Sequence, residues 1–306
     1  MIKLIILYAL TAGIFPLNKL LIAAGALIFF TGIRMVLGGA LILIYVWATG
    51  RLDTTIFRSR YWWPLLQLTV CNVFLTNILQ IWATQFVDTG TACFLYNFAP
   101  FFAALFSFWL FNERITIRKL LGLIIGFAAF IPLVLTTQSV SAFDLPSPGY
   151  FIPEIALLIA AAASVWGWIV MKQLVHLSNG LLITANGLTM ILGGLLCFPF
   201  SLALEAWKPV PIFQFWPFVG CVIGMIILSN IIGYNAYTFL LRQYSPTFLT
   251  FTSFMSPFFA AAYGYLLFGE PITWHLFVAA IAVVTGLSLY YYDEIRLKEI
   301  KKDLLN

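Results

Sequence analysis

The sequence predicts an all-α integral membrane protein of ten transmembrane helices, arranged as two inverted five-helix repeats. Three observations predict this fold. The 306-residue chain is 62% hydrophobic and only 9% charged, with a mean hydropathy of +1.01, whereas a soluble domain is about 25% charged. Its apolar residues fall into ten runs long enough to cross a bilayer, and two stretches 157 residues apart are nearly identical.

The ten spans are found by dividing the chain at charges and turn residues, because a helix needs about 20 apolar residues to cross the hydrocarbon layer. The predicted spans are 3–22, 28–48, 62–86, 90–111, 116–137, 151–175, 181–204, 214–241, 247–268 and 273–293. A polar linker, 138–150, separates a first repeat, 1–137, from a second, 151–293, which a tail, 294–306, follows. We expect no cleaved signal, since the first apolar run continues directly into the second span.

The cations set an orientation for these spans. Of the 16 Lys and Arg residues, 13 fall at the ends of the chain or in even-numbered loops, and only Lys19 and Lys208 fall on the opposite side. The 13 are Lys3, Arg51, Arg58, Arg60, Arg114, Arg118, Lys119, Lys172, Arg242, Arg296, Lys298, Lys301 and Lys302. Because cytoplasmic loops carry an excess of Lys and Arg, we expect both termini and the tail to be cytoplasmic.

The duplicated stretches each place a proline in an apolar run and end in a glutamate 13 residues later, followed by X-Ile-Thr. They begin at Pro100 and Pro257 and reach Glu113 and Glu270. Met-X-Leu-Gly-Gly also occurs twice, at 35–39 and 190–194. Because each repeat has an odd number of spans, the two repeats must cross the membrane in opposite senses. Inverted repeats are typical of carriers that work by alternating access.

The proline-to-glutamate blocks resemble the hallmark of the drug/metabolite transporter superfamily, EamA type, over essentially the whole chain. In that family a proline in the fourth helix of each repeat precedes a Gly-Glu turn; here Asn112 replaces the first glycine. The resemblance implies a secondary carrier of the inner membrane that moves a small organic metabolite, such as an amino acid, a nucleoside or an S-adenosylmethionine-like compound. It also implies a central cavity formed by spans 1, 3, 4, 6, 8 and 9.

Two polar stripes at helical spacing mark a candidate substrate site: Asn77, Gln80 and Thr84 in the third span, and Asn230, Tyr234 and Tyr237 in the eighth. An offset of 157 residues pairs Asn77 with Tyr234 and Gln80 with Tyr237. Polar side chains inside a bilayer need a partner or a cavity, so the stripes predict a site near the midplane. The alternative is hydrogen bonding between packed helices.

Pro100 and Pro257 predict kinks or hinges within their spans. A proline removes a backbone donor and leaves the carbonyl four residues earlier unpaired, which here belongs to Tyr96 or Ser253. The side chains one turn before each proline are therefore further candidates for substrate binding, together with a tryptophan of the sixth span. They are Tyr96, Asn97, Ser253, Phe254 and Trp166.

Arg34 is the one cation well inside a predicted span, and it is a candidate partner for an anionic group of the substrate. The alternative is that it snorkels or bonds to backbone carbonyls. The 11 acidic residues all fall outside the middles of the predicted spans, and the chain contains no phosphate-binding P-loop. We therefore expect a facilitator or an exchanger rather than a proton symporter or an ATPase.

No enzyme, cofactor or metal site is expected. The two histidines, His176 and His275, lie on opposite predicted sides, and the four cysteines form no CxxC pair. Two alternatives stay open: an integral membrane enzyme and a non-transporting membrane subunit. The expected partners are a small-molecule substrate and the lipid bilayer, not nucleic acid, for a monomer or weak dimer in the inner membrane.

Overall fold

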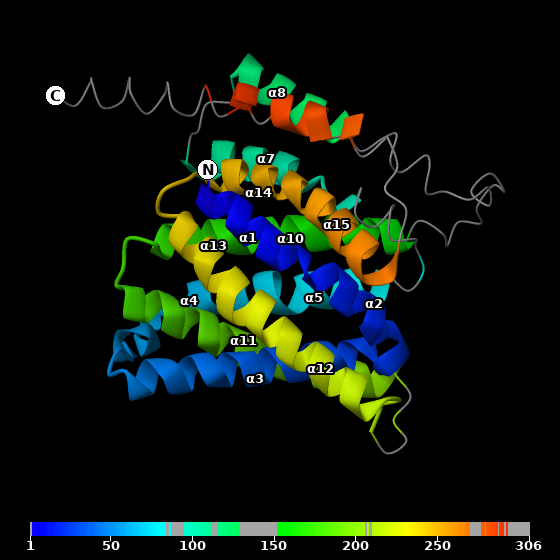
Figure 1. Cartoon of the computed structure of the whole chain (residues 1–306). Coiled ribbons are helices and arrows are strands. Elements are labelled where there is room, and N and C mark those ends of the chain that lie inside the picture. Colours follow the sequence, from blue (N-terminus) through cyan, green and yellow to red (C-terminus); the bar gives the residue numbers. More distant parts are fainter. Residues whose placement is uncertain are drawn as a thin grey trace.

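A computed structural model describes residues 2–83, 86, 95–111, 116–128, 152–205, 207, 210–269 and 277–292 without 279, 287 and 291. The described residues are largely helical, and further helical residues lie between 277 and 292 (Figure 1). The elements are α1 (Ile2–Ala12), α2 (Ile14–Ala24), α3 (Leu27–Ala48), η1 (Thr54–Phe57), α4 (Ser59–Gln67), η2 (Leu68–Leu75), α5 (Thr76–Ala83), α7 (Ala99–Phe111), α8 (Ile117–Ala128), α10 (Ile152–Leu174), α11 (Asn179–Leu204), α12 (Phe215–Met225), η3 (Ile226–Gly233), α13 (Tyr234–Leu240), α14 (Pro246–Thr252), η4 (Ser253–Met255) and α15 (Ser256–Phe268).

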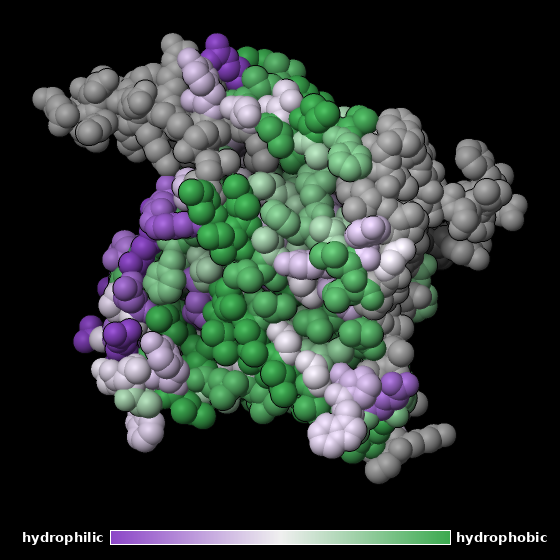
Figure 2. All heavy atoms as spheres, viewed as in Figure 1, coloured by the Kyte–Doolittle hydropathy of each residue, from purple (hydrophilic) through white to green (hydrophobic). Residues whose placement is uncertain are grey.

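Five helical stretches in the described part are long and apolar enough to cross a membrane. They are Leu27–Ala48, Ser59–Ala83, Ile152–Leu174, Asn179–Leu204 and Phe215–Leu240. Figure 2 shows hydrophobic side chains over the middle of the face in view, with hydrophilic ones gathered along its left rim. The all-helical membrane fold is thus confirmed, whereas the number of ten spans stays a prediction. The linker 138–150, the tail 294–306, Glu113 and Glu270 lie outside the described residues.

The first predicted span is not one continuous helix. α1 ends at Ala12, a turn at Gly13 follows, and α2 begins at Ile14. Pro16 lies in the first turn of α2, where its missing N–H costs nothing. In a continuous helix the ring of Pro16 would clash with the carbonyl of Ala12, so the chain starts a second helix instead.

Each of the two duplicated prolines lies at the start of a helix, directly after an interruption of its predicted span, and their role as hinges stays a prediction. Pro100 is the second residue of α7, and Pro257 is the second residue of α15, directly after the 3₁₀ turn η4. The prediction of an unpaired carbonyl at Ser253 is wrong, because this carbonyl accepts a hydrogen bond from the backbone N–H of Ser256. The 3₁₀ turn makes this possible, since it pairs residues three apart rather than four.

α3 and α11 form a close antiparallel pair at one edge of the bundle (Figure 1). Their backbones touch through glycines: a Cβ placed on Gly39 would lie 2.5 Å from the carbonyl oxygen of Gly187, and one on Gly194 would lie 2.9 Å from that of Gly32. The Met-X-Leu-Gly-Gly match equates Gly32 with Gly187 and Gly39 with Gly194. The two contacts are therefore equivalent under an exchange of the two repeats.

Polar side chains tie both ends of this pair. The Glu205 carboxylate, just after α11, accepts hydrogen bonds from the backbone N–H groups of Ile28 at 2.7 Å and Phe29 at 2.9 Å, and so caps α3. At the other end the Ser178 hydroxyl donates to Asp53 at 2.6 Å. Hydrogen bonds from Ser178 and Thr55 hold the pKa of the Asp53 carboxyl below its ordinary value.

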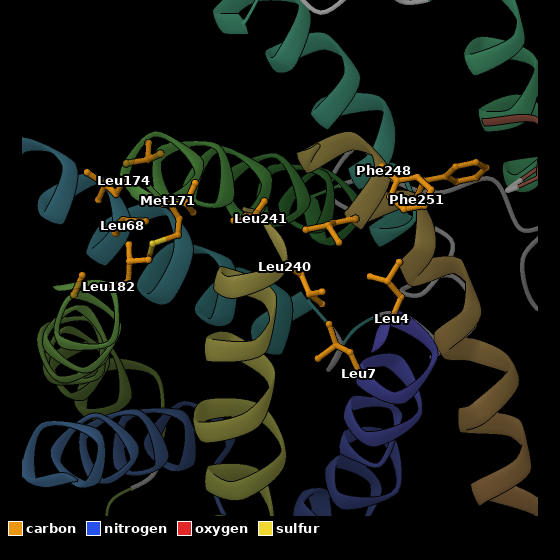
Figure 3. Close-up of a cluster of buried hydrophobic side chains, with 14 of the residues drawn as sticks. Leu4, Leu7, Leu68, Met171, Leu174, Leu182, Leu240, Leu241, Phe248 and Phe251 are labelled. Carbon is orange, nitrogen blue, oxygen red and sulfur yellow. The ribbon is translucent and has the colours of Figure 1, made fainter. Parts of the chain in front are cut away.

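The largest apolar core lies where α10 and α13 end. Side chains from α1, α10, α13 and α14 converge there, among them Leu4, Met171, Leu240 and Phe248 (Figure 3). The same ends are joined by two cations. Lys172 of α10 donates to the carbonyls of Leu241 and Tyr244, and Arg242 donates to the carbonyl of Leu177 at 2.7 Å. Apolar packing and hydrogen bonds therefore join these helices at this end of the bundle.

Candidate functional site

Two π-helical segments interrupt two of the long spans at equivalent places. η2 joins α4 to α5, and η3 joins α12 to α13. Both ends of η3 lie 158 residues after the corresponding ends of η2. Each is followed by an asparagine that returns to a π-helical carbonyl: Asn77 donates to Val73 at 2.6 Å, and Asn235 donates to Ile231 at 2.9 Å. π-helical turns are rare and occur frequently at functional sites.

These contacts correct the predicted register of the two polar stripes. At an offset of 158 residues Asn77 corresponds to Asn235, and Asn72 corresponds to Asn230, so that both pairs are identical residues. The predicted pairing of Asn77 with Tyr234 used the offset of the proline blocks, 157. The third and eighth spans therefore align at an offset of 158, one residue more than the proline blocks, and the prediction missed this difference.

Arg34 lies between the two π-helical spans. Its Nη2 donates to Asn77 Oδ1 at 2.5 Å, and its Nη1 donates to Ser229 Oγ and Asn230 Oδ1, both at 3.3 Å. The residue is only 7% exposed, and its Nε is buried without a hydrogen-bond partner in the described part of the protein. Arg34 thus belongs to the same cluster as the polar stripes and joins α3 to both of them.

By the Met-X-Leu-Gly-Gly match the counterpart of Arg34 in the second repeat is Thr189, a neutral residue whose hydroxyl donates to the carbonyls of Ala185 and Asn186. The side chain of Asn186 in α11 donates to Asn235 Oδ1 and to Thr238 Oγ1, each at 3.1 Å. Asn235 is the equivalent of Asn77. The side-chain oxygen of Asn77 accepts from the guanidinium of Arg34, whereas that of Asn235 accepts from the amide of Asn186. The two halves of the site share the two asparagine pairs but differ by one positive charge.

An aromatic cluster adjoins these polar residues. The ring centroid of Trp168 lies 4.2 Å from that of Tyr237 and 5.3 Å from that of Tyr234. The Tyr234 hydroxyl donates to the backbone carbonyl of Asn72 at 3.3 Å, which joins the cluster to η2. The Tyr237 hydroxyl is buried and has no hydrogen-bond partner among the described residues. Such a cluster can stack on a planar base or hold a cation against its ring faces.

The structure brings part of the predicted site together. Asn77, Asn230, Tyr234 and Arg34 form one cluster through the contacts given above, and Tyr237 joins it through Trp168. Gln80 is half-buried on α5. Thr84 lies outside the described residues. None of these placements tests whether the residues bind a substrate, so their role stays a prediction.

The other predicted residues lie elsewhere. The indole of Trp166 donates to Gln67 Oε1 at 2.8 Å and packs on Phe106, away from the rings of Trp168 and Tyr234. Phe254 is fully buried in the core, edge-on to Phe251. The remaining members also have local surroundings: Tyr96 packs beside Ala161 and Val165, Asn97 has a buried Nδ2 without a partner in the described part, and the Ser253 hydroxyl donates to the carbonyl of Thr250 at 2.6 Å.

Sequence reasoning missed Trp168, Asn186 and Asn235. Asn235 could have been identified from the sequence, because an offset of 158 between the third and eighth spans pairs Asn72 with Asn230 and Asn77 with Asn235. Asn186 and Trp168 carry no such pattern. Among the described residues, no group of His, Cys, Asp and Glu side chains could hold a metal ion.

Comparison with known proteins assigns this architecture. The sequence profile of the EamA-like transporter family matches the chain twice, over residues 1–135 and 152–292. The S-adenosylmethionine/S-adenosylhomocysteine transporter of Chlamydia trachomatis serovar L2 is 34% identical over 285 residues, covering 92% of this chain and 86% of that protein. The protein of the same name from Chlamydia muridarum is 33% identical and covers 92% and 88% of the two chains.

Two further similarities are more distant. The uncharacterized transporter YvbV of Bacillus subtilis is 23% identical over 280 residues, which cover 90% of this chain and 85% of that protein. A solved crystal structure superposes with a TM-score of 0.76 over 97% of this chain and 96% of its own, at 16% identity. At that identity the superposition shows a shared fold alone.

Proposed function

The chain belongs to the EamA-like transporter family, and from this premise we propose that it exchanges S-adenosylmethionine and S-adenosylhomocysteine across the inner membrane by alternating access. Membership confirms the resemblance inferred from the two proline-to-glutamate blocks. It makes the protein a multi-pass membrane transporter of a small molecule. The alternatives of a membrane enzyme and a non-transporting subunit are thereby set aside.

The substrate assignment is supported first by the relatives. Two chlamydial proteins named for S-adenosylmethionine and S-adenosylhomocysteine transport align with more than nine-tenths of this chain at 33–34% identity. At this coverage the similarity extends over both repeats.

The observation that carries the proposal within the structure is the aromatic cluster of Trp168, Tyr234 and Tyr237. Both compounds contain adenine, a planar base that stacks on aromatic rings with about 1–3 kcal/mol per contact. S-adenosylmethionine also has a sulfonium cation, which ring faces attract. A neutral aromatic surface can also pack against the uncharged thioether of S-adenosylhomocysteine, so one site can take both compounds, as an exchanger requires.

Alternating access is supported by the correspondence between the two halves. The glycine contacts of α3 and α11 are equivalent under exchange of the repeats, and so are the π-helical segments with their asparagine contacts. An antiparallel pair of equivalent helices is what inverted repeats produce. Two equivalent halves can adopt each other's conformation, which gives two states open to opposite sides. The cation distribution supports cytoplasmic termini.

Counterflow in proteoliposomes tests the function. Vesicles that contain the purified protein are loaded with unlabelled S-adenosylhomocysteine and placed in labelled S-adenosylmethionine. We expect labelled S-adenosylmethionine to accumulate in loaded vesicles and not in empty ones, and an uncoupler of the proton gradient to leave this accumulation unchanged. An equal signal in protein-free vesicles would contradict the transport assignment. Accumulation of S-adenosylmethionine in empty vesicles under an imposed proton gradient would instead indicate a proton symporter.

A further inference from the structure

Arg34 is a buried cation whose charge is not neutralised within the described site. It lies about 5 Å along the helix axis from the midpoint of α3, at 1.5 Å per residue. Its three hydrogen bonds end on the neutral oxygens of Asn77, Ser229 and Asn230, and its Nε has no partner among the described residues. A buried charge without a counter-ion is costly, so such a site favours an anion.

The carboxylates that the structure describes are Asp53, Glu154 and Glu205, and their positions leave Arg34 unmatched. Asp53 accepts from Thr55 and Ser178 beyond the end of α3. Glu205 accepts from the N–H groups of Ile28 and Phe29 at the start of α3, about two helical turns from Arg34. Glu154 lies in the first turn of α10. The described part of the protein therefore supplies Arg34 with amide and hydroxyl oxygens instead of an anion.

The second repeat shows that this position does not require a cation for helix packing. The counterpart of Arg34 there, Thr189, donates to carbonyls of its own helix. The amide of Asn186, at a different position of α11, donates to Asn235 as the guanidinium of Arg34 donates to Asn77. If Arg34 served only to hold helices together, an amide would suffice, as it does in the other half. The positive charge in the first half has a different use.

We propose that Arg34 binds the carboxylate of the substrate's amino-acid portion, with Nε–H as the donor that the fold leaves open for it. The assignment rests on the proposed function, because it concerns the same site. Asn230, Tyr234 and Tyr237 follow one face of η3 and α13 over about 10 Å. This face leads from Arg34 to the aromatic cluster, so the carboxylate and the adenine of one extended molecule bind at neighbouring helical turns.

The first test compares two ligands on the unmodified protein. S-adenosylmethionine and its decarboxylated form differ only in the carboxylate, and their binding to protein in lipid nanodiscs can be measured by calorimetry. We expect the decarboxylated compound to bind about tenfold to a hundredfold more weakly, the range for loss of charge-assisted hydrogen bonds. Equal affinities would overturn the role of Arg34 and leave the proposed function standing. Absence of binding by both compounds would overturn the proposed function itself.

The second test assigns the effect to Arg34. In Arg34→Gln, which replaces the guanidinium by a neutral amide, we expect the two ligands to bind with equal, weak affinity. Arg242→Gln makes the same change of side chain outside the cluster, where Arg242 donates to the carbonyl of Leu177, and we expect it to keep the preference for the carboxylate. A preference retained in Arg34→Gln would overturn the proposal. If that variant does not fold, the ligand comparison on the unmodified protein decides.

Discussion

Tyr237 and Tyr8 are two buried tyrosines with opposite hydrogen-bonding states. The Tyr8 hydroxyl donates to the carbonyl of Leu249 at 2.6 Å, whereas the Tyr237 hydroxyl has no partner among the described residues. A buried hydroxyl without a partner costs about 1–3 kcal/mol, so it is retained where it serves another purpose. The difference allows stability and substrate binding to be separated at two chemically identical positions.

Tyr237→Phe should leave the protein as stable as before, or more stable, because the substitution removes an unsatisfied hydroxyl. Tyr8→Phe should lower the stability by about 1 kcal/mol through the loss of its hydrogen bond. Counterflow should fall by about tenfold in Tyr237→Phe if the hydroxyl bonds to the substrate. Thermal unfolding in detergent and counterflow measure the two effects. A destabilised Tyr237→Phe with normal counterflow would contradict this reading of the hydroxyl.

The residues of the site were only partly predictable. Arg34 stands out in the sequence because a cation inside an apolar run is expensive, and Asn77, Asn230 and Tyr234 follow from helical spacing. Trp168 could not be predicted, because tryptophan also occurs at membrane interfaces, against lipid and in protein cores. Trp166, two residues away, points to Gln67 instead. Only the packing of α10 against its neighbours distinguishes the two.

Among the helices, the contact of α3 with α11 depends on the absence of side chains. A Cβ on Gly39 would meet the carbonyl oxygen of Gly187 at 2.5 Å and Ile191 at 2.9 Å, and backbone atoms cannot move aside as a flexible side chain can. Small residues at such positions let membrane helices approach closely. The two helices therefore pack backbone against backbone.

Gly39→Ala should destabilise the protein by about 1–3 kcal/mol, the usual cost of overpacking. Gly220→Ala is the matched control, because a Cβ on this exposed glycine of α12 would meet no atom within 4 Å. The control should be neutral or slightly stabilising, since alanine favours a helix by roughly 0.5–1 kcal/mol over glycine. Unfolding midpoints in the same detergent give the comparison. Equal midpoints for both variants would show that α3 and α11 can separate at little cost.

The sequence predicted the helices whose bounds depend on the length of an apolar run, but not the segments that depend on local backbone geometry. Spans such as 28–48 and 181–204 agree with α3 and α11 within a few residues, because a membrane helix needs a fixed length. The π-helical segments η2 and η3 have ordinary apolar sequences, and an extra residue per turn leaves no trace in composition. The break after Ala12 could have been read from Pro16, whose ring excludes a continuous helix.

For the whole molecule, the charge distribution makes a prediction that the structure alone does not test. Thr54→Cys lies on the predicted cytoplasmic side, and Phe213→Cys lies on the opposite side; both positions are exposed. In a background without the four native cysteines, a membrane-impermeant thiol reagent added to intact spheroplasts should label Phe213→Cys alone. Thr54→Cys should react only after the membrane is permeabilised. The reverse pattern would invert the orientation of the protein.

For the whole molecule, the repeats and the membrane orientation could be predicted from the sequence, but the packing of one half against the other could not. Duplication, the number of matching blocks and the bias of the cations are all properties of the sequence. That α3 packs on its own counterpart α11 is not, because repeats in a sequence carry no information on which helices of the two halves meet. This contact follows only from the three-dimensional placement of Gly32, Gly39, Gly187 and Gly194.

The glycine contact between α3 and α11 also bears on the order in which the protein is inserted and packed during synthesis. Its two sides are about 150 residues apart in the chain, so α3 leaves the ribosome long before the partner that covers its glycine face. During that interval the face is presented to lipid, where helices remain independently stable without tertiary contacts. Insertion of the first half therefore precedes its packing, and synthesis of α11 is the step that allows the bundle to close.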